Sequence, residues 1–211
     1  MLDGKTLIEY SIRSLNLKHN DILIIVVLTS VHVSEIEQVL DALHIPCVWE
    51  IIVLENETSG QAATVNEVVS HFNSDQDLII HNCDTAMNFT GTKLDSNCAG
   101  WMLLFSSNLP QLSYADIDDN GYVLKTAEKQ VISNFASTGT YYFESIRTYK
   151  KYYQQSHFGP GEHYITPIYN SMISDNLIVR GFLAQNVFIL GTPSDLKSNE
   201  RILKELWVPK W

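Results

Sequence analysis

The chain has 211 residues, 45% of them hydrophobic, and its 14 basic against 24 acidic residues give a formal net charge of −10. A chain of this length can bury about 70% of its unfolded surface, so neither a disulfide framework nor a structural metal is needed to hold a core. The acidic balance, without any long basic run, excludes a protein that follows a nucleic-acid backbone.

We also expect no segment that directs the protein into or across a membrane. The longest apolar run, residues 22–28, is far shorter than the roughly 20 residues of a membrane span, and residues 1–5 have no apolar signal-peptide core. Cys47, Cys83 and Cys98 are widely spaced and form no Cys-x-x-Cys pair. We therefore expect a cytoplasmic protein without membrane insertion, whose cysteines are reduced and structural.

Helices and strands alternate in the first part of the chain. Capping residues predict the starts of two amphipathic helices, at Thr6 with Glu9 and at Ser34 with Glu37. The continuous apolar run of residues 22–28 is typical of a parallel strand buried on both faces. The same patterns predict further strands at residues 48–54 and 78–80 and a helix at residues 62–72.

Shorter strands follow from Trp101 onward. Residues 113–117 and 122–124 flank an Asp-Asp-Asn-Gly turn and predict a β-hairpin. Alternating strands and helices followed by hairpins predict an α/β protein with a Rossmann-like mixed sheet. The sequence contains no internal repeat or linker, so residues 1–211 are expected to form one domain.

Ligands of open α/β sheets bind beyond the carboxyl ends of the strands, where three segments of this sequence fall. In the first, Thr58, Gly60, Gln61 and Ala62 form a small-residue turn between a strand and a helix. Gly60 would allow the backbone to approach a ring or a phosphate, and the helix N-terminus adds partial positive charge. The alternative is a plain strand-to-helix turn.

The second segment ends at Asp84, directly after the strand predicted at residues 78–80. A carboxylate there can hold Mg²⁺ together with substrate phosphates, or it can cap the loop. The third segment contains Glu128 and Lys129 beyond a predicted strand. Lys129 can neutralise a phosphate while Glu128 accepts hydrogen bonds from hydroxyl groups, or the two form a solvated surface pair.

Taken in order, these segments resemble the sugar-phosphate nucleotidyltransferase family, above all its capsule-associated, glucose-1-phosphate thymidylyltransferase-like members. The similarity extends over nearly the whole chain. The matching patterns and segments are GKPLIEY.I at residues 4–12, ET.GAA.TV at 57–65, I.N.D at 80–84, SY..LDENG at 113–121, AEK.VIS at 127–133,..GIYYF at 137–143, GEFYV.PVYN at 161–170 and LGTPEDL at 190–196.

The resemblance implies a glycosyltransferase-A type of fold and transfer of a nucleoside monophosphate from a triphosphate to a sugar phosphate or similar small phosphorylated molecule. Pyrophosphate is released, and the product serves surface-polysaccharide synthesis. The resemblance further implies roles for individual residues: base contact by Thr58, Gly60, Gln61 and Ala62, Mg²⁺ binding and α-phosphate orientation by Asp84, and an acceptor pocket of Glu128, Lys129, Gly139 and Thr140.

In that family a strand and a glycine-rich loop precede the segment that residues 4–12 match, and they have no counterpart in this sequence. Ile189 also stands where many relatives have a second metal-binding Asp. The sheet is therefore expected to lack its first strand, a gap that a homodimer could fill. Two hypotheses stay open, an active transferase or a degenerate, non-catalytic sugar-phosphate-binding or assembly protein. A glycosyltransferase is the least favoured, because Asp84-Thr85-Ala86 is not an Asp-x-Asp pair.

Overall fold

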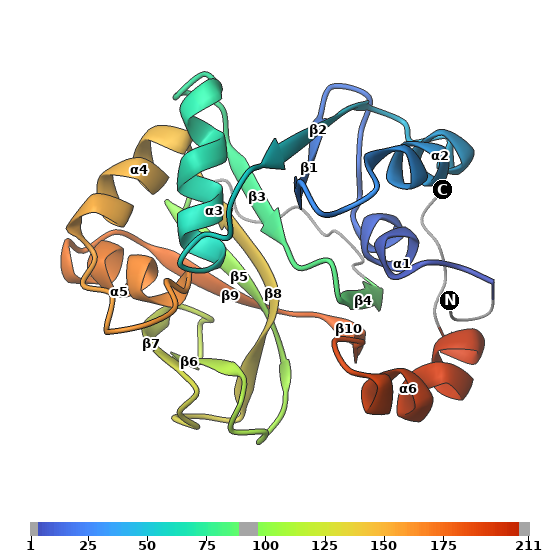
Figure 1. Ribbon diagram of the computed structural model, residues 1–211. Coiled ribbons are helices and arrows are strands. Elements are labelled where there is room, and N and C mark those ends of the chain that lie inside the picture. The colour runs from blue at the N-terminus through green and yellow to red at the C-terminus, as the bar shows by residue number, and fades with distance from the viewer. Residues whose placement is uncertain (1–3, 89–96, 207–211) are drawn as a thin grey trace.

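The computed structural model describes residues 4–88 and 97–206, and its largest sheet is mixed (Figure 1). The strand order is β7-β6-β8-β5-β9, and β3 pairs with the second half of β8. Only β5 and β9 pair in parallel; the other pairs are antiparallel. These strands are β3 (Leu78–His81), β5 (Gly100–Ser106), β6 (Ser113–Ile117), β7 (Val123–Glu128), β8 (Phe135–Phe143) and β9 (Val179–Leu183). The predicted hairpin is β6–β7, and the α/β class with a mixed sheet is confirmed.

Three helices lie beside this sheet, α3 (Gln61–Val68), α4 (Ile146–Gln155) and α5 (Thr166–Ser174), and α4 packs against both of the others (Figure 1). α3 continues into a 3₁₀ turn, η1 (Val69–His71), which accounts for the longer helix predicted there. Aromatic rings fill the space between helices and sheet: Phe143 stacks on Tyr169 and meets Tyr149 edge to face. This largest apolar cluster holds α3 and α5 in fixed positions at the sheet.

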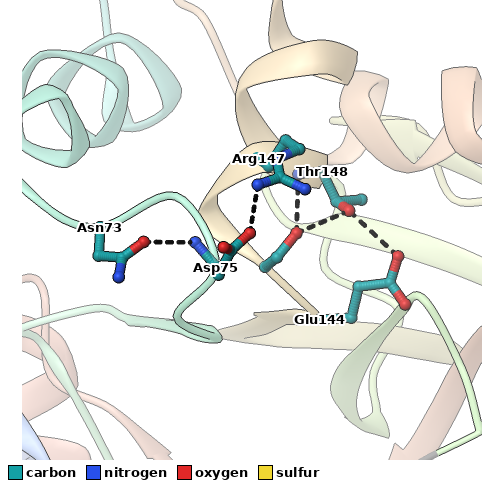
Figure 2. A network of polar contacts seen from close by, with 6 residues as sticks. Asn73, Asp75, Glu144, Arg147 and Thr148 are labelled. Atoms are coloured by element: carbon teal, nitrogen blue, oxygen red, sulfur yellow. Dashed lines mark hydrogen bonds and ion pairs between the residues drawn. The ribbon is translucent and has the colours of Figure 1, made fainter.

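The start of α4 is tied to the turn that leads into β3 (Figure 2). Ser145 caps the helix by accepting a hydrogen bond from the Thr148 backbone. The Arg147 backbone donates to the Ser74 carbonyl at 2.8 Å, and its guanidinium pairs with Asp75. Because both charges are well exposed, the backbone bonds contribute more to this junction than the ion pair does.

A second, two-stranded parallel sheet is formed by β1 (Ile22–Leu28) and β2 (Val48–Leu54), which α2 (Val33–Leu43) connects. The parallel pairing is confirmed, but the prediction that residues 22–28 are buried on both faces is wrong. Within the described residues β1 pairs only with β2, and β3 only with β8. Among the described residues, therefore, no strand lies beside one edge of β1, and Leu23 is the one buried residue of this strand.

α1 (Leu7–Ser14) joins this small sheet to the rest of the molecule (Figure 1). Thr6 caps it as predicted, accepting a hydrogen bond from the Glu9 backbone. One face, with Ile12, packs on β1 and α2, while Tyr10 packs on a third sheet and a helix. These are the antiparallel pair β4 (Thr85–Asn88) and β10 (Gln185–Ile189), and α6 (Pro193–Leu206).

The predicted cap of α2 is wrong. The helix begins at Val33 after His32, so Ser34 lies inside its first turn and makes no capping bond. Ser and Glu at this spacing match the capping pattern, but the observed N-cap, His32, lies two residues before the predicted one. In the part of the chain that the structure describes, no helix is both long and apolar enough to span a bilayer.

Candidate active site

The start of α3, the end of β3 and the middle of β8 meet at one point. Gln61 Nε2 donates to Asn82 Oδ1 at 2.6 Å, and the Asn82 backbone donates to the Gly139 carbonyl at 3.2 Å. Gly139 has a φ of +81°, and a Cβ built on it would lie 2.5 Å from Asn82 Cγ. Only glycine therefore lets the Asn82 side chain approach β8 this closely.

The turn before α3 is held by short polar contacts. The hydroxyl groups of Thr58 and Thr64 share a hydrogen bond of 2.6 Å, and both oxygens lie within hydrogen-bond distance of the Gly60 carbonyl, at 3.1 and 3.2 Å. Two hollows adjoin this turn. A cavity of about 690 Å³ lies between it, β2 and α3, and a smaller one of about 300 Å³ is lined by Thr58, Ser59, Gly60, Gly161 and Glu162.

A loop from the second half of the chain lies directly over the turn. His163 donates its backbone N–H to the Ser59 carbonyl, and its own carbonyl accepts from the Ala62 backbone at 2.9 Å. Ala62 is fully buried and has its N–H in this bond. The loop thus takes up a free N–H at the start of α3, and Gly60 makes room for the loop itself: a Cβ there would lie 2.5 Å from Glu162 Cγ.

We expect Gly60→Ala to destabilise the protein by about 1–3 kcal/mol, because a φ of +129° with ψ near 180° is open only to glycine and the new methyl group would collide with the loop. Gly159→Ala, in the same loop, is the matched control, since a Cβ there meets nothing within 4 Å. Its effect should stay within about 0.5 kcal/mol. Urea unfolding measures both, and equal effects of the two variants would contradict the expectation.

Glu128 lies at the end of β7, facing the start of α5. Its two carboxylate oxygens accept hydrogen bonds from Thr166 Oγ1 and from Ser113 Oγ, the latter at 2.7 Å. Asn170 of α5 brackets the backbone of Thr126, donating to its carbonyl and accepting from its N–H. These contacts fix the distance between strand and helix, and Glu128 is oriented by two hydroxyl donors. Each oxygen keeps a lone pair for a further donor.

Lys129, the next residue, is exposed and has a left-handed backbone with φ of +50°. Its N–H donates to the Leu112 carbonyl at 3.1 Å, and its ammonium group lies 5.0 Å from the centre of the Tyr164 ring. Tyr164 is the largest cause of a raised pKa of Lys129, with Glu162 and Glu128 adding to it. The side chain is therefore a cation at the rim of the site.

Burial raises the pKa of Glu128, against the lowering effect of its two hydroxyl donors and Lys129. A raised folded-state pKa means that ionisation opposes folding: the group stabilises the fold at acid pH, and this contribution is lost as the pH rises through the folded pKa. We expect Glu128→Gln to be more stable than the unchanged protein at pH 7, with the gain vanishing below the ordinary glutamate pKa of about 4.3.

Thermal unfolding between pH 3.5 and 8 tests this pH dependence of stability. Glu50→Gln, on the exposed side of β2, is the matched control, because the same chemical change there removes no buried carboxylate. A Glu128→Gln variant whose relative stability falls as the pH rises would show that the hydroxyl donors outweigh burial, opposite to the expected sign.

Asp84 follows β3 and lies against the strand-to-helix turn at Gly191. Its backbone carbonyl accepts from Leu190 at 2.7 Å, and a Cβ on Gly191 would lie 2.6 Å from Asp84 Oδ2. The half-buried carboxylate takes part in none of the hydrogen bonds or ion pairs formed among the described residues. Nor do three or more His, Cys, Asp or Glu side chains of residues 4–88 and 97–206 gather as metal ligands. A cation here would have one protein carboxylate, a donor set that suits Mg²⁺ only with substrate phosphates as further ligands.

Thr140 follows Gly139 on β8 and is paired with His81 of β3. Its hydroxyl is 2.8 Å from His81 Nδ1 and accepts from Thr138. Burial lowers the pKa of His81 to about 4, so the ring is neutral at neutral pH. The contact between Thr140 and His81 therefore links β8 to β3, and Thr140 itself is 2% exposed.

Three residues of the site were not singled out from the sequence: Asn82, Glu162 and Tyr164. Asn82 stands in the segment that contains Asp84, but an amide after a strand is too common to be distinctive. Glu162 and Tyr164 lie within the matching segment of residues 161–170, but the resemblance assigns no role to either residue. The loop that carries Glu162 and Tyr164 has no periodicity from which its position over α3 could be predicted.

Comparison with solved structures places the fold among nucleotidyltransferases, although no family profile and no curated protein sequence matches the chain. The nucleoside-diphosphate-sugar pyrophosphorylase from Vibrio cholerae RC9 is 26% identical, with a TM-score of 0.86 over 95% of this chain and 89% of that one. The inositol-1-phosphate CTP transferase from T. maritima is 16% identical, with a TM-score of 0.73 over 99% and 87%.

A third similar structure is a UDP-glucose pyrophosphorylase complexed with UDP-glucose, 10% identical, with a TM-score of 0.74 over 96% of this chain and 88% of that one. At such low identity these last two likenesses concern the fold alone. The expected Rossmann-like mixed sheet of the nucleotidyltransferase type is confirmed.

Proposed function

We propose that the chain transfers a nucleoside monophosphate from a nucleoside triphosphate to a small phosphorylated acceptor such as a sugar phosphate. The observation that carries the proposal is the position of Asp84, Glu128 and Lys129 at strand ends of a nucleotidyltransferase fold, together with the two cavities that adjoin the turn before α3. A carboxylate for a metal, a cation for a phosphate and an acceptor for hydroxyl groups are the three functions that the reaction needs.

In the proposed reaction an oxygen of the acceptor phosphate attacks the α-phosphorus, forming a new P–O bond as the bond to the β-phosphate breaks. Pyrophosphate leaves with the bonding electron pair, and no covalent enzyme intermediate forms. Lys129 neutralises the acceptor phosphate, and Glu128 orients the acceptor by accepting hydrogen bonds from its hydroxyl groups. Asp84 would hold Mg²⁺, which when bound neutralises charge on the phosphates.

The proposal includes a role and a location in the cell for the protein. We assign the product to surface-polysaccharide synthesis and the protein to the cytoplasm, where triphosphates and phosphorylated sugars occur. The unpaired edge of β1 keeps a homodimer as a prediction, which light scattering tests.

The test is pyrophosphate release by the purified chain with Mg²⁺, each common ribonucleoside triphosphate and dTTP, and a set of sugar 1-phosphates and phosphorylated polyols. We expect release with one triphosphate only when an acceptor is present, which separates transfer from hydrolysis. Binding of a sugar phosphate in calorimetry without turnover of any triphosphate would contradict the proposal and favour the non-catalytic alternative.

A further inference from the structure

A lysine on the surface is a poorly defined phosphate ligand, because four rotatable bonds let its ammonium group range widely. Lys129 differs from such a mobile surface lysine in two ways. Its backbone is fixed by the left-handed conformation and the bond to Leu112, and its ammonium lies over the Tyr164 ring. The backbone and the ammonium group of Lys129 are therefore both held in defined positions.

Tyr164 is in turn held by the neighbouring loop. Its hydroxyl donates to Glu162 Oε2 at 2.6 Å, and Glu162 lies over Gly60. The loop is fastened to the α3 turn by the two backbone bonds of His163. A continuous chain of contacts thus leads from the turn before α3 to the ammonium of Lys129.

Packing does not account for the Tyr164 ring. It is half-buried and belongs to none of the apolar clusters formed by the described residues. Its ring faces the ammonium group of Lys129, and its hydroxyl donates to Glu162. An aromatic face beneath an ammonium group restricts the cation without neutralising it, unlike a carboxylate, so the lysine stays available to a phosphate.

We propose that Tyr164 and Glu162 are positioning residues that hold the ammonium group of Lys129 for the phosphate of the acceptor. This inference rests on the proposed function, since it assigns a role within the same site. Neither residue touches the reacting atoms; both act through Lys129.

The test measures steady-state kinetics of Tyr164→Leu and Tyr164→Phe, alone and combined with Lys129→Ala. We expect Tyr164→Leu to raise the KM for the acceptor about two- to five-fold, and Tyr164→Phe, which keeps the ring, to raise it less. The KM for the triphosphate should change less than two-fold. In the Lys129→Ala background the Leu substitution should have no further effect on the acceptor KM, because its partner is gone.

Tyr122→Leu is the matched control: this ring lies 4.9 Å from Arg180 beside the β6–β7 turn, and its loss should leave both KM values unchanged. Glu162→Gln, which disturbs the fold less than Tyr164→Leu does, should also raise the acceptor KM. An unchanged acceptor KM in Tyr164→Leu, or an equal increase with and without Lys129, would overturn the inference alone. Absence of turnover by the unchanged protein would overturn the proposed function, and this inference with it.

Discussion

Asp84→Asn is expected to lower the rate of Mg²⁺-dependent pyrophosphate release at least about 10³-fold, the largest effect on activity that we predict. Asparagine keeps the size of the side chain but removes the charge that would hold a divalent cation, and such a cation contributes several kcal/mol of transition-state stabilisation. The packing against Gly191 should survive, because the two side chains have the same shape.

Initial rates measured over a range of Mg²⁺ concentrations test this expectation. The matched control is Asp119→Asn, an exposed residue in the turn at the far end of the β6–β7 hairpin from Glu128. The Asp119→Asn variant should retain full activity. A variant at Asp84 that keeps its rate at low Mg²⁺ would mean that the carboxylate holds no metal.

Phe143→Ala should cost about 3–5 kcal/mol of the free energy of unfolding, the largest effect on stability that we predict. The ring is fully buried, with its centre 4.9 Å from the Tyr169 ring and 5.0 Å from the Tyr149 ring. Its backbone pairs with both β3 and β5, so the residue cannot move to close the cavity. The substitution therefore removes contacts that join α4 and α5 to the strands β3, β5 and β8.

Urea denaturation followed by circular dichroism measures the loss, and the midpoint of thermal unfolding should fall by roughly 6–20 °C for a chain of this size. Leu124→Ala on β7 is the control, because that side chain is 55% exposed and should cost well below 1 kcal/mol. A small effect at Phe143 would mean that the helices repack around the vacant space.

Two local patterns predicted local structure correctly, whereas the capping pattern at Ser34 misplaced the start of α2. The capping box at Thr6 predicted α1, and the Asp-Asn-Gly turn predicted the β6–β7 hairpin, because in both cases the deciding contacts lie within a few residues. The prediction that residues 22–28 are buried on both faces was wrong for the opposite reason. An apolar run reports that a strand suits a buried sheet, but whether a further strand lies beside it depends on segments distant in sequence.

The same distinction between local and distant contacts applies to the candidate active site. Asp84, Glu128 and Lys129 stand out in the sequence because each is a charged residue beyond a strand. Asn82 and Tyr164 acquire their roles from Gly139 and from Lys129, which the chain brings to them from elsewhere. Such pairings leave no mark in residue spacing.

The position of α1 between two sheets has a consequence for the order of folding. Tyr10 near one end of the chain packs with Phe188 and Leu203 near the other, and closing so long a loop is entropically expensive. We therefore expect the cluster around β5 and β8 to form first and α1 to dock late. Since Ser11 of α1 donates to the Asn82 carbonyl at 3.0 Å, the site reaches its final geometry only when that docking is complete.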